Sequence, residues 1–344
     1  MRHRLLSLVT AVLLAASLAE AATLVPEQRF KTAGDFTGKR PGKVAQDVSG
    51  LACMPVANGT QRCLLINDES AFAQFAEIAE NRITPGATVP IVGTEASAAV
   101  LGTAPQNICR TEGRFAELDG EAVAYAEGAF YIAGSHGCSR KNGEFRLSAF
   151  HLARLRVDAT GAPAGQVELT YRLSDVLRRA GEAGAFFGKS LMDEGGINVE
   201  GIAVHGDTLW VGLRAPSLGG RAFLLGASLK ALFAPGHAPA TEAPRVIALP
   251  AGRDRGIRDL ALLPNGRLLA LVGPAQEQEL PYALLLVDPA RPEAVVDLGE
   301  LPERRKAKAE SLTVLAEQDR KLSVLIGYDG PRNGHFESYR LQLP

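Results

Sequence analysis

The chain has 344 residues, of which 46% are hydrophobic, and its formal net charge is −1. A chain of this length can bury a large core, so one domain can account for all of it. Acidic and basic residues are balanced, and no block rich in arginine or lysine is present. The composition therefore gives no electrostatic case for nucleic acid as a partner.

The first residues have the features of a secretory signal. Arg2 and Arg4 precede an apolar run from Leu5 to Leu18, and Ala19-Glu20-Ala21 has the small-x-small pattern that signal peptidase reads. The run is short for a membrane-spanning helix. We therefore expect residues 1–21 to be a signal peptide, with an uncleaved membrane anchor as the alternative. Residues 22–344 would then form a periplasmic or secreted protein without a membrane span.

Export makes the four cysteines readable as disulfides. Cys53 and Cys63 flank a segment with an Asn58-Gly59 turn signal, so they would face each other across a hairpin. Four cysteines allow three pairings, and this geometry favours Cys53 with Cys63 and Cys109 with Cys138. A zinc site is poorly supported, because no second close pair of cysteine or histidine has finger spacing.

A short pattern recurs along the chain at the start of predicted strands. Each copy has a polar residue first, mostly a small residue next, and then largely apolar residues. The five copies are Ser49-Gly50-Leu51-Ala52, Glu121-Ala122-Val123-Ala124, Glu200-Gly201-Ile202-Ala203, Asp259-Leu260-Ala261-Leu262 and Glu310-Ser311-Leu312-Thr313. A turn and a second strand follow each copy, as expected of blades with about four strands and variable outer loops.

These repeats predict an all-β fold, a single β-propeller with five blades, or six if one of the two longest units contains two. A pair of β-sandwiches is the rival architecture. Only 34 residues follow Glu310, so the last blade lacks a strand that the N-terminal segment Thr23 to Phe30 would supply. The clearest helical segment is Ser174 to Glu182, with Ser174 as its N-cap.

The propeller would bring one set of polar residues to one face. The start of a first strand and the end of the antiparallel second strand lie at the same end of a blade. Strand starts contribute Ser49, Glu121, Glu200, Asp259 and Glu310, and strand ends contribute Asp68, His136, Arg214 and Asp329. This face is therefore the predicted position of a small-molecule ligand or substrate.

Four carboxylates around one axis repel one another unless something compensates them. A divalent cation could bind Glu121, Glu200, Asp259 and Glu310, and oxygen ligands favour calcium before magnesium. Alternatively, Arg214 and Arg258 pair with the carboxylates, or some carboxylates are protonated. The acidic residues could also serve only as acceptors for backbone N–H groups of neighbouring blades.

Other residues of this face are candidates for catalysis and binding. His136 or Asp68 would transfer protons, and His136 is alternatively a loop residue that forms hydrogen bonds. Arg214, Arg258 and Asp329 are the candidate substrate-binding residues, and a guanidinium such as that of Arg214 can hold a carboxylate or phosphate. An ion pair between blades is the alternative role of Arg214.

With these segments in view, the chain resembles the secreted bacterial domain-of-unknown-function family 3616. The matching segments are Asp47 to Ala52, Phe130 to His136, Asn198 to Ala203, Val211 to Pro216, Gly256 to Ala261 and Gly327 to Gly330. The Glu-Gly-Ile-Ala element is also similar to strand starts in phytase-related esterase-like and gluconolactonase-type propellers. The first resemblance implies no activity. The looser ones imply a propeller and calcium-assisted hydrolysis, although blade one departs from the acidic pattern with Ser49.

Two functions of different classes follow from this reading. The first is a calcium-assisted hydrolase of an ester, lactone or phosphoester. The second is a non-catalytic propeller that binds a ligand or a protein on the same face. The sequence does not indicate an oligomeric state.

Overall fold

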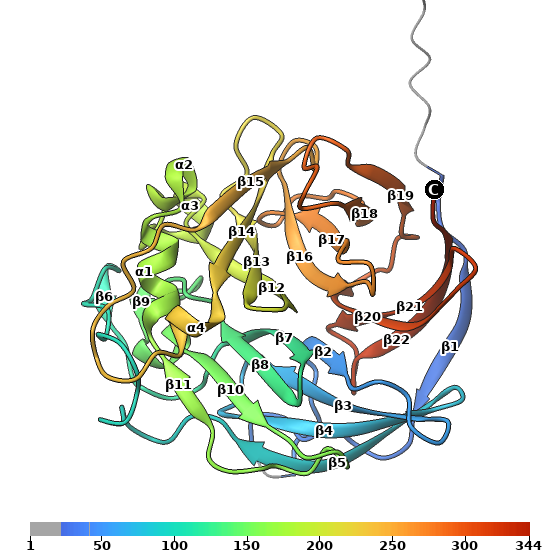
Figure 1. The fold of residues 1–344 in the computed structure, drawn as a ribbon, viewed down its shortest axis with the longest axis horizontal. Helices are drawn as coiled ribbons and strands as arrows, with labels where there is room; N and C mark the ends of the chain where they lie inside the picture. Colours follow the sequence, from blue (N-terminus) through green and yellow to red (C-terminus); the bar gives the residue numbers. More distant parts are fainter. Residues whose placement is uncertain (1–21, 41) are drawn as a thin grey trace, which may run out of the picture.

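The computed structural model describes residues 22–344 except residue 41. The described residues form a ring of four-stranded antiparallel sheets around a central axis (Figure 1). The predicted signal peptide, residues 1–21, lies outside the described residues. In the described part of the chain, no helix has the length and apolar character that a membrane crossing requires.

Five blades of four strands each, numbered 1 to 5 in chain order, can be distinguished among the described residues, and blades 1 and 5 are joined into one eight-stranded sheet. The prediction of a five-bladed all-β propeller is therefore confirmed, and a sixth blade is not formed by these residues. Blade 1 consists of β2 (Val48–Cys53), β3 (Thr60–Asn67), β4 (Phe72–Ala79) and β5 (Arg82–Pro90). Blade 2 consists of β7 (Gly120–Ala126), β8 (Ala129–Gly134), β10 (Leu152–Arg156) and β11 (Glu168–Thr170).

The remaining three blades repeat this arrangement. Blade 3 consists of β12 (Asn198–His205), β13 (Thr208–Ala215), β14 (Ala222–Ser228) and β15 (Arg245–Leu249). Blade 4 consists of β16 (Arg255–Leu262), β17 (Leu268–Pro274), β18 (Ala283–Val287) and β19 (Val296–Glu300). Blade 5 consists of β20 (Lys308–Gln318), β21 (Lys321–Asp329), β22 (His335–Gln342) and the N-terminal β1 (Pro26–Thr32).

Strand β1 closes the ring, as the sequence predicted. Its first part pairs antiparallel with β22, where Phe30 faces Phe336. Its last two residues, Lys31 and Thr32, pair in parallel with Arg82 and Ile83 of β5. One strand thus joins the last blade to the first, and the two ends of the chain hold the circle together.

Short elements lie outside the blades. They are β6 (Thr111–Glu112), paired with β9 (Glu144–Phe145), the 3-10 helix Leu147–Phe150, and the helices α1 (Arg172–Arg178), α2 (Gly181–Gly184), α3 (Leu191–Glu194) and α4 (Leu229–Leu232). The predicted helix at Ser174 to Glu182 is two short helices, and Ser174 lies inside α1 rather than at its N-cap. The two disulfides are the expected ones, Cys53–Cys63 across the β2–β3 hairpin and Cys109–Cys138.

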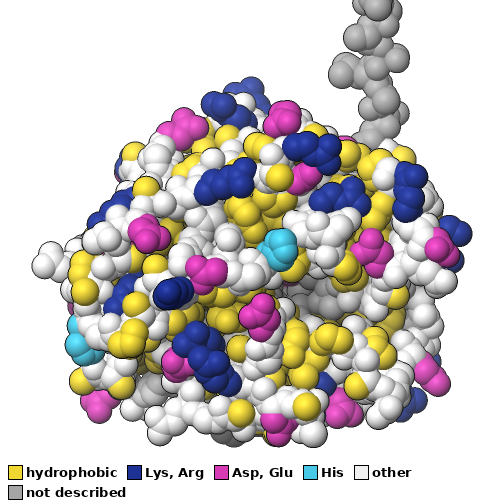
Figure 2. All heavy atoms as spheres, in the orientation of Figure 1, with side chains coloured by type: hydrophobic (Ala, Val, Ile, Leu, Met, Phe, Trp, Pro, Cys, Tyr) yellow, Lys and Arg dark blue, Asp and Glu magenta, His cyan; other side chains and the backbone are white. Residues whose placement is uncertain are grey.

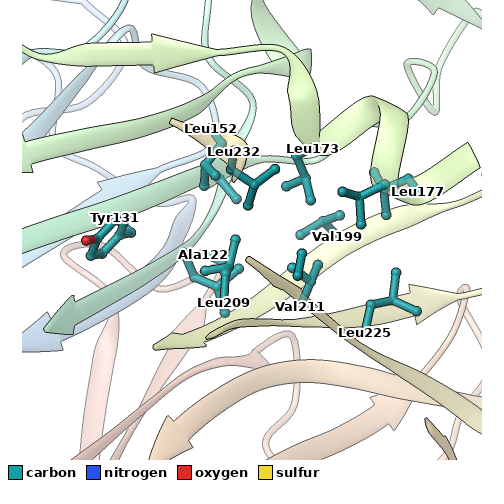
Figure 3. Close-up of a cluster of buried hydrophobic side chains, with 14 of the residues drawn as sticks. Ala122, Tyr131, Leu152, Leu173, Leu177, Val199, Leu209, Val211, Leu225 and Leu232 are labelled. Atoms are coloured by element: carbon teal, nitrogen blue, oxygen red, sulfur yellow. The ribbon is translucent and has the colours of Figure 1, made fainter. Parts of the chain in front are cut away.

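The core is divided among the seams between blades. Side chains of blades 2 and 3 meet under helices α1 and α4, where Leu173 and Leu232 pack over Val199 and Val211 (Figure 3). Similar apolar clusters fill the seams between blades 3 and 4, 4 and 5, 5 and 1, and 1 and 2. Because every blade buries both faces, strands such as β8 and β17 are buried along their whole length.

The two ends of the channel differ in chemistry. Toward the hairpin turns of the inner strands, an opening of about 330 Å³ is lined largely by apolar residues such as Leu51, Val123, Ile202, Leu260 and Leu312. Figure 2 shows hydrophobic side chains around a hollow at the centre of one face. The opposite end, at the starts of the inner strands, carries buried charges and is called the channel mouth below.

Candidate functional site

Each innermost strand has a β-bulge at an equivalent position near its start. A bulge takes one residue out of the regular strand pairing and re-aims its side chain. From blade 1 to blade 5, the residues left out of register are Ser49, Glu121, Glu200, Arg258 and Glu310. These five bulge residues surround the channel mouth, because each comes from the equivalent position of a different blade.

The register corrects the sequence alignment of blade 4 by one residue. Arg258, not Asp259, is the equivalent of Glu200. The Asp259 carboxylate accepts hydrogen bonds from its neighbour Leu260 N, at 2.8 Å, and from Leu312 N of blade 5, at 2.6 Å. Asp259 therefore fastens blade 4 to blade 5, the structural role that was the alternative to metal binding.

Three of the bulge residues form a buried ladder of alternating charge with Arg214. Arg214 Nη1 lies 2.8 Å from Glu200 Oε1, and Arg258 Nη2 lies 3.2 Å from Glu200 Oε2. Arg258 Nη2 also contacts Glu310 Oε1. All four side chains are less than a tenth exposed. Of the outcomes expected for clustered carboxylates, pairing with arginine is the one found for Glu200 and Glu310.

This arrangement does not fit a calcium ion held by Glu121, Glu200, Asp259 and Glu310. Calcium needs six to eight oxygen ligands near one centre. Within the described residues, no group of three or more acidic, histidine or cysteine side chains is arranged to hold a metal ion. Arginine side chains already contact both carboxylate oxygens of Glu200 and one of Glu310, and backbone amides donate to both oxygens of Asp259.

Glu121 differs from the other charged bulge residues. Its carboxylate makes no hydrogen bond or ion pair with any described residue. It lines a pocket of about 210 Å³ near the starts of blades 1 to 3, together with Asp68, Asp119, Asn198 and Arg140. This group of Asp68, Asp119, Glu121 and Asn198 is called the acidic pocket below.

Burial disfavours ionised carboxylates in the acidic pocket. Burial raises the pKa of Glu121 well above its usual value, and the charges of Glu200, Asp119 and Asp68 raise it further. Burial likewise raises the pKa of Asp68, with Asp119 and Asp47 adding to the shift. Burial also raises the pKa of Asp119, although the Ser135 hydroxyl donates a hydrogen bond to it. The pocket thus concentrates carboxylates. Arg140, Lys141 and Arg146 also line it, but none of them forms an ion pair with Asp68, Asp119 or Glu121 among the described residues.

The acidic pocket also contains hydrogen-bond acceptors without donors. Asn198 is 7% exposed, and its Oδ1 has no partner among the described residues. Asp68 Oδ1 is also buried and has no hydrogen-bond partner among the described residues. Unpaired buried acceptors are uncommon in folded proteins and cost free energy. A ligand that brings N–H or O–H donors would satisfy them.

His136 does not reach the acidic pocket or the axis. Its ring is completely buried and packs against Phe150, and its Nδ1 donates a hydrogen bond to Gly134 O over 2.9 Å. Burial lowers its pKa to about 4. A general base must come within hydrogen-bond reach of its substrate, so the structure favours the loop role for His136 rather than catalysis.

The predicted substrate-binding residues have different surroundings. Arg214 and Arg258 are 3% and 1% exposed and serve the ion-pair ladder. Arg214 also donates to the carbonyl oxygens of Ala275 and Gln276. Asp329 lies at the end of β21, and burial and the charge of Asp47 raise its pKa to about 6. Substrate binding by Asp329 stays a prediction.

A second repeated position in the sequence could have indicated Asp119 and Asn198 of the acidic pocket, which were not among the predicted site residues. The position two residues before each bulge is occupied, from blade 1 to blade 5, by Asp47, Asp119, Asn198, Gly256 and Lys308. This second repeated position is acidic in blades 1 and 2, an amide in blade 3, glycine in blade 4 and basic in blade 5. Arg140 belongs to the loop after β8, and no repeated pattern in the sequence predicts that this loop reaches the acidic pocket.

The strands and the channel mouth define a five-bladed propeller with a charged site at one end of its axis. The family described as "Protein of unknown function (DUF3616)" matches residues 156–340. The match spans more than half of the chain, and the protein belongs to this family. A comparison with curated proteins found no match.

Several solved structures are distantly similar in fold. Hydrazine synthase of Kuenenia stuttgartiensis is 10% identical with a TM-score of 0.39, covering 86% of this chain and 59% of its own. Regucalcin of Agrobacterium tumefaciens, described as calcium-binding, is 12% identical with a TM-score of 0.40, covering 95% and 98%. A protein of unknown function from Dyadobacter fermentans is 12% identical with a TM-score of 0.42, covering 89% and 78%. This chain spans about three-fifths of the hydrazine synthase chain, and at these scores no feature of the site is taken from any of them.

Proposed function

We propose that the protein is an exported propeller that binds an organic cation, a guanidinium or ammonium group, in the acidic pocket. The observation that carries the proposal is the Glu121 carboxylate, partly buried at a bulge position and without a partner among the described residues. The other charged bulge residues, Glu200, Arg258 and Glu310, are paired. A cationic group would complete the pattern of alternating charge around the ring.

The donor and acceptor inventory supports a polyatomic cation rather than a metal ion. The pocket offers the carboxylates of Asp68, Asp119 and Glu121 and the free Oδ1 of Asn198, all of which accept hydrogen bonds. A guanidinium has five N–H donors and an ammonium has three, spread around the group. These donors can reach acceptors that are spread around the pocket. A metal ion would instead require acceptors that all point toward one centre.

The protein's own Arg140 supports this preference. Arg140 lines the acidic pocket. Burial alone would lower the pKa of its guanidinium, but the charges of Glu121, Glu200 and Glu310 raise it. The nearest ion pair of Arg140 is with Glu277, at 3.4 Å, and not with Glu121. The field of the pocket therefore favours a guanidinium, while Arg140 leaves the Glu121 carboxylate free.

Isothermal titration calorimetry with agmatine, which carries both a guanidinium and an ammonium group, tests the proposal. We expect saturable binding by the wild-type protein and binding at least tenfold weaker by Glu121→Gln, equivalent to about 1.4 kcal/mol. Glu127→Gln is the matched control, because Glu127 is exposed in the turn at the other end of the same strand. It should bind agmatine like the wild type.

Further titrations separate the alternatives. Sodium chloride at the same ionic strength should produce no saturable heat, and calcium chloride should not compete with agmatine. Calcium binding that Glu121→Gln abolishes would instead support the calcium site. Equal agmatine affinity of the wild-type and Glu121→Gln proteins would contradict the proposal.

Hydrolysis without a metal is a second candidate, favoured by the raised pKa values of Glu121 and Asp68. A carboxyl group that keeps its proton near neutral pH can act as a general acid, and its neighbour as a base. Asp68 would then transfer protons during hydrolysis of an ester, lactone or phosphoester. Aryl ester and aryl phosphate turnover that disappears in both Asp68→Asn and Glu121→Gln would support this function.

The localisation is part of the proposal. We infer that residues 1–21 are removed on export and that residues 22–344 act in the periplasm or outside the cell. Two disulfides are typical of an oxidising compartment. The N-terminal sequence of the protein recovered from the periplasm or the medium tests this, with Ala22 as the expected first residue.

A further inference from the structure

A second charged site lies next to the acidic pocket and shares Arg140 with it, and one side chain of the protein occupies it. The Glu277 carboxylate faces three cations, all through Oε1: Arg140 Nη1 at 3.4 Å, Lys308 Nζ at 3.4 Å and Arg214 Nη2 at 3.9 Å. The three cations come from blades 2, 5 and 3, and Glu277 comes from the loop after β17 in blade 4. Side chains that are far apart in the sequence thus converge on one carboxylate oxygen.

These contacts are loose for ion pairs. Charge-assisted N–H···O bonds to a carboxylate are usually about 2.7–2.9 Å long, shorter than all three distances. The Glu277 side chain is 50% exposed, and those of Arg140 and Lys308 are 46% and 37% exposed. Ion pairs with this exposure contribute about 0–1 kcal/mol, so little free energy holds Glu277 in place.

Glu277 is shared by more than one cation. Arg214 is neutralised by Glu200, with which it forms a buried pair. Arg140 and Lys308 have no other ion pair within residues 22–40 and 42–344. Glu277 is therefore the one carboxylate within ion-pair distance of both cations, while Glu121 acts on Arg140 and Asp329 on Lys308 from farther away. An anion with two negative charges and several oxygens would match both cations and span the wide distances between them.

The loop that carries Glu277 is held by hydrogen bonds to helix α3 and to Arg214. Gln276 Nε2 donates to the carbonyl oxygens of Leu191, at 2.7 Å, and Met192, at 3.0 Å. The Arg214 guanidinium donates to the carbonyl oxygens of Ala275, at 3.0 Å, and Gln276, at 3.2 Å. The Glu277 side chain can therefore rotate away from the cations while the loop stays in place.

The space next to Glu277 is large enough for the body of a ligand. Glu277, Arg214 and Lys308 line a pocket of about 520 Å³ between blades 4 and 5, which Tyr282 and Tyr328 also line. A volume of this size is typical of small-molecule sites. Aromatic side chains suit an apolar or ring-shaped group attached to the anion.

We propose that Arg140, Lys308 and Arg214 form a binding site for a phosphate-type dianion, and that Glu277 is an internal stand-in that a phosphate monoester displaces. The organic part of the monoester would lie in the pocket beside Tyr282 and Tyr328. This site shares Arg140 with the acidic pocket, but its other two cations, Lys308 and Arg214, do not line that pocket, and the proposal does not rest on agmatine binding.

Titration with phenyl phosphate in a calorimeter tests the proposal on the full mature chain. Glu277→Gln removes the internal carboxylate charge and should bind phenyl phosphate about tenfold more tightly than the wild type. Lys308→Met in the Glu277→Gln background should lose at least that gain. Glu279→Gln is the matched control, because Glu279 lines the same pocket from the same loop and forms no ion pair with the described residues.

Competition with inorganic phosphate and with acetate tests whether the site prefers a dianion. Phosphate should compete with phenyl phosphate, and acetate should do so much more weakly. Equal phenyl phosphate affinity of wild-type, Glu277→Gln and Glu279→Gln proteins would overturn the proposal, as would no binding by any of them. Thermal unfolding of each variant by circular dichroism shows that a lost affinity is not lost folding. Agmatine binding that persists in Glu277→Gln separates a failure of this site from a failure of the acidic pocket.

Discussion

The guanidinium of Arg214 donates a hydrogen bond to the carboxylate of Glu200 over 2.8 Å, although both side chains are at most 3% exposed. The two residues belong to the paired strands β13 and β12 of blade 3. Two buried charges at this distance stabilise each other only while both are present. The pair begins the ladder of ion pairs that continues through Arg258 to Glu310. Because the ladder uses Glu200 and Glu310, Glu121 is the bulge carboxylate without an ion-pair partner among the described residues.

Arg214→Met is expected to lower the free energy of unfolding by about 3–5 kcal/mol, because it leaves a buried carboxylate with one partner fewer. Urea unfolding followed by circular dichroism measures the loss. The double variant Arg214→Met with Glu200→Leu should recover a large part of it, because it removes both charges. Equal losses in the single and the double variant would show that the ion pair is not the cause.

Glu121→Gln should stabilise the unliganded protein at pH 8. The pKa of Glu121 is raised in the folded state, so the folded protein binds the proton more tightly than the unfolded chain. This contribution to stability is present at low pH and is lost as the pH rises through the raised pKa. Glutamine avoids the loss, and we expect a gain of about 1 kcal/mol at pH 8, measured by urea unfolding. The gain should shrink toward pH 5, and a gain that grows at low pH would contradict the assignment.

Agmatine affinity should increase with pH between 5.5 and 8. The cation binds the ionised carboxylates, and the raised pKa values of Glu121 and Asp68 keep part of them protonated at the lower pH. Binding should therefore release protons, which calorimetry detects as a dependence of the heat on the ionisation enthalpy of the buffer. An affinity that falls as the pH rises would be incompatible with binding to these carboxylates.

Phe30→Ala should weaken the closure of the ring. Phe30 is 6% exposed and belongs to the apolar cluster between blades 5 and 1. Truncation of a buried phenylalanine costs about 3–5 kcal/mol, which thermal and urea unfolding would show. Gln28→Ala on the same strand is the control, because Gln28 is exposed. Similar effects of the two variants would mean that β1 contributes through its backbone alone.

Much of the architecture could be predicted from the sequence because it depends on local patterns. The alternation of apolar strands with turns indicated the blades, and the short last unit indicated that the N-terminal strand completes it. The Asn58-Gly59 turn placed Cys53 opposite Cys63. Each of these inferences rests on a few neighbouring residues and on strand geometry.

The candidate site was predicted less completely, for two physical reasons. A bulge shifts the register by one residue, and the sequence does not show where it falls, so Asp259 was aligned where Arg258 lies. Loop residues such as Arg140 and Glu277 follow no repeat, and their meeting at the axis depends on the whole ring. The sequence did indicate arginine pairing as one outcome, but not that Glu121 would be the carboxylate left without a partner.

The most direct test of the account is agmatine titration of wild-type, Glu121→Gln and Glu127→Gln proteins at pH 8. The account predicts saturable binding by the wild type and Glu127→Gln, and binding at least tenfold weaker by Glu121→Gln. The same affinity in all three proteins would show that the free carboxylate at the channel mouth is not a cation site.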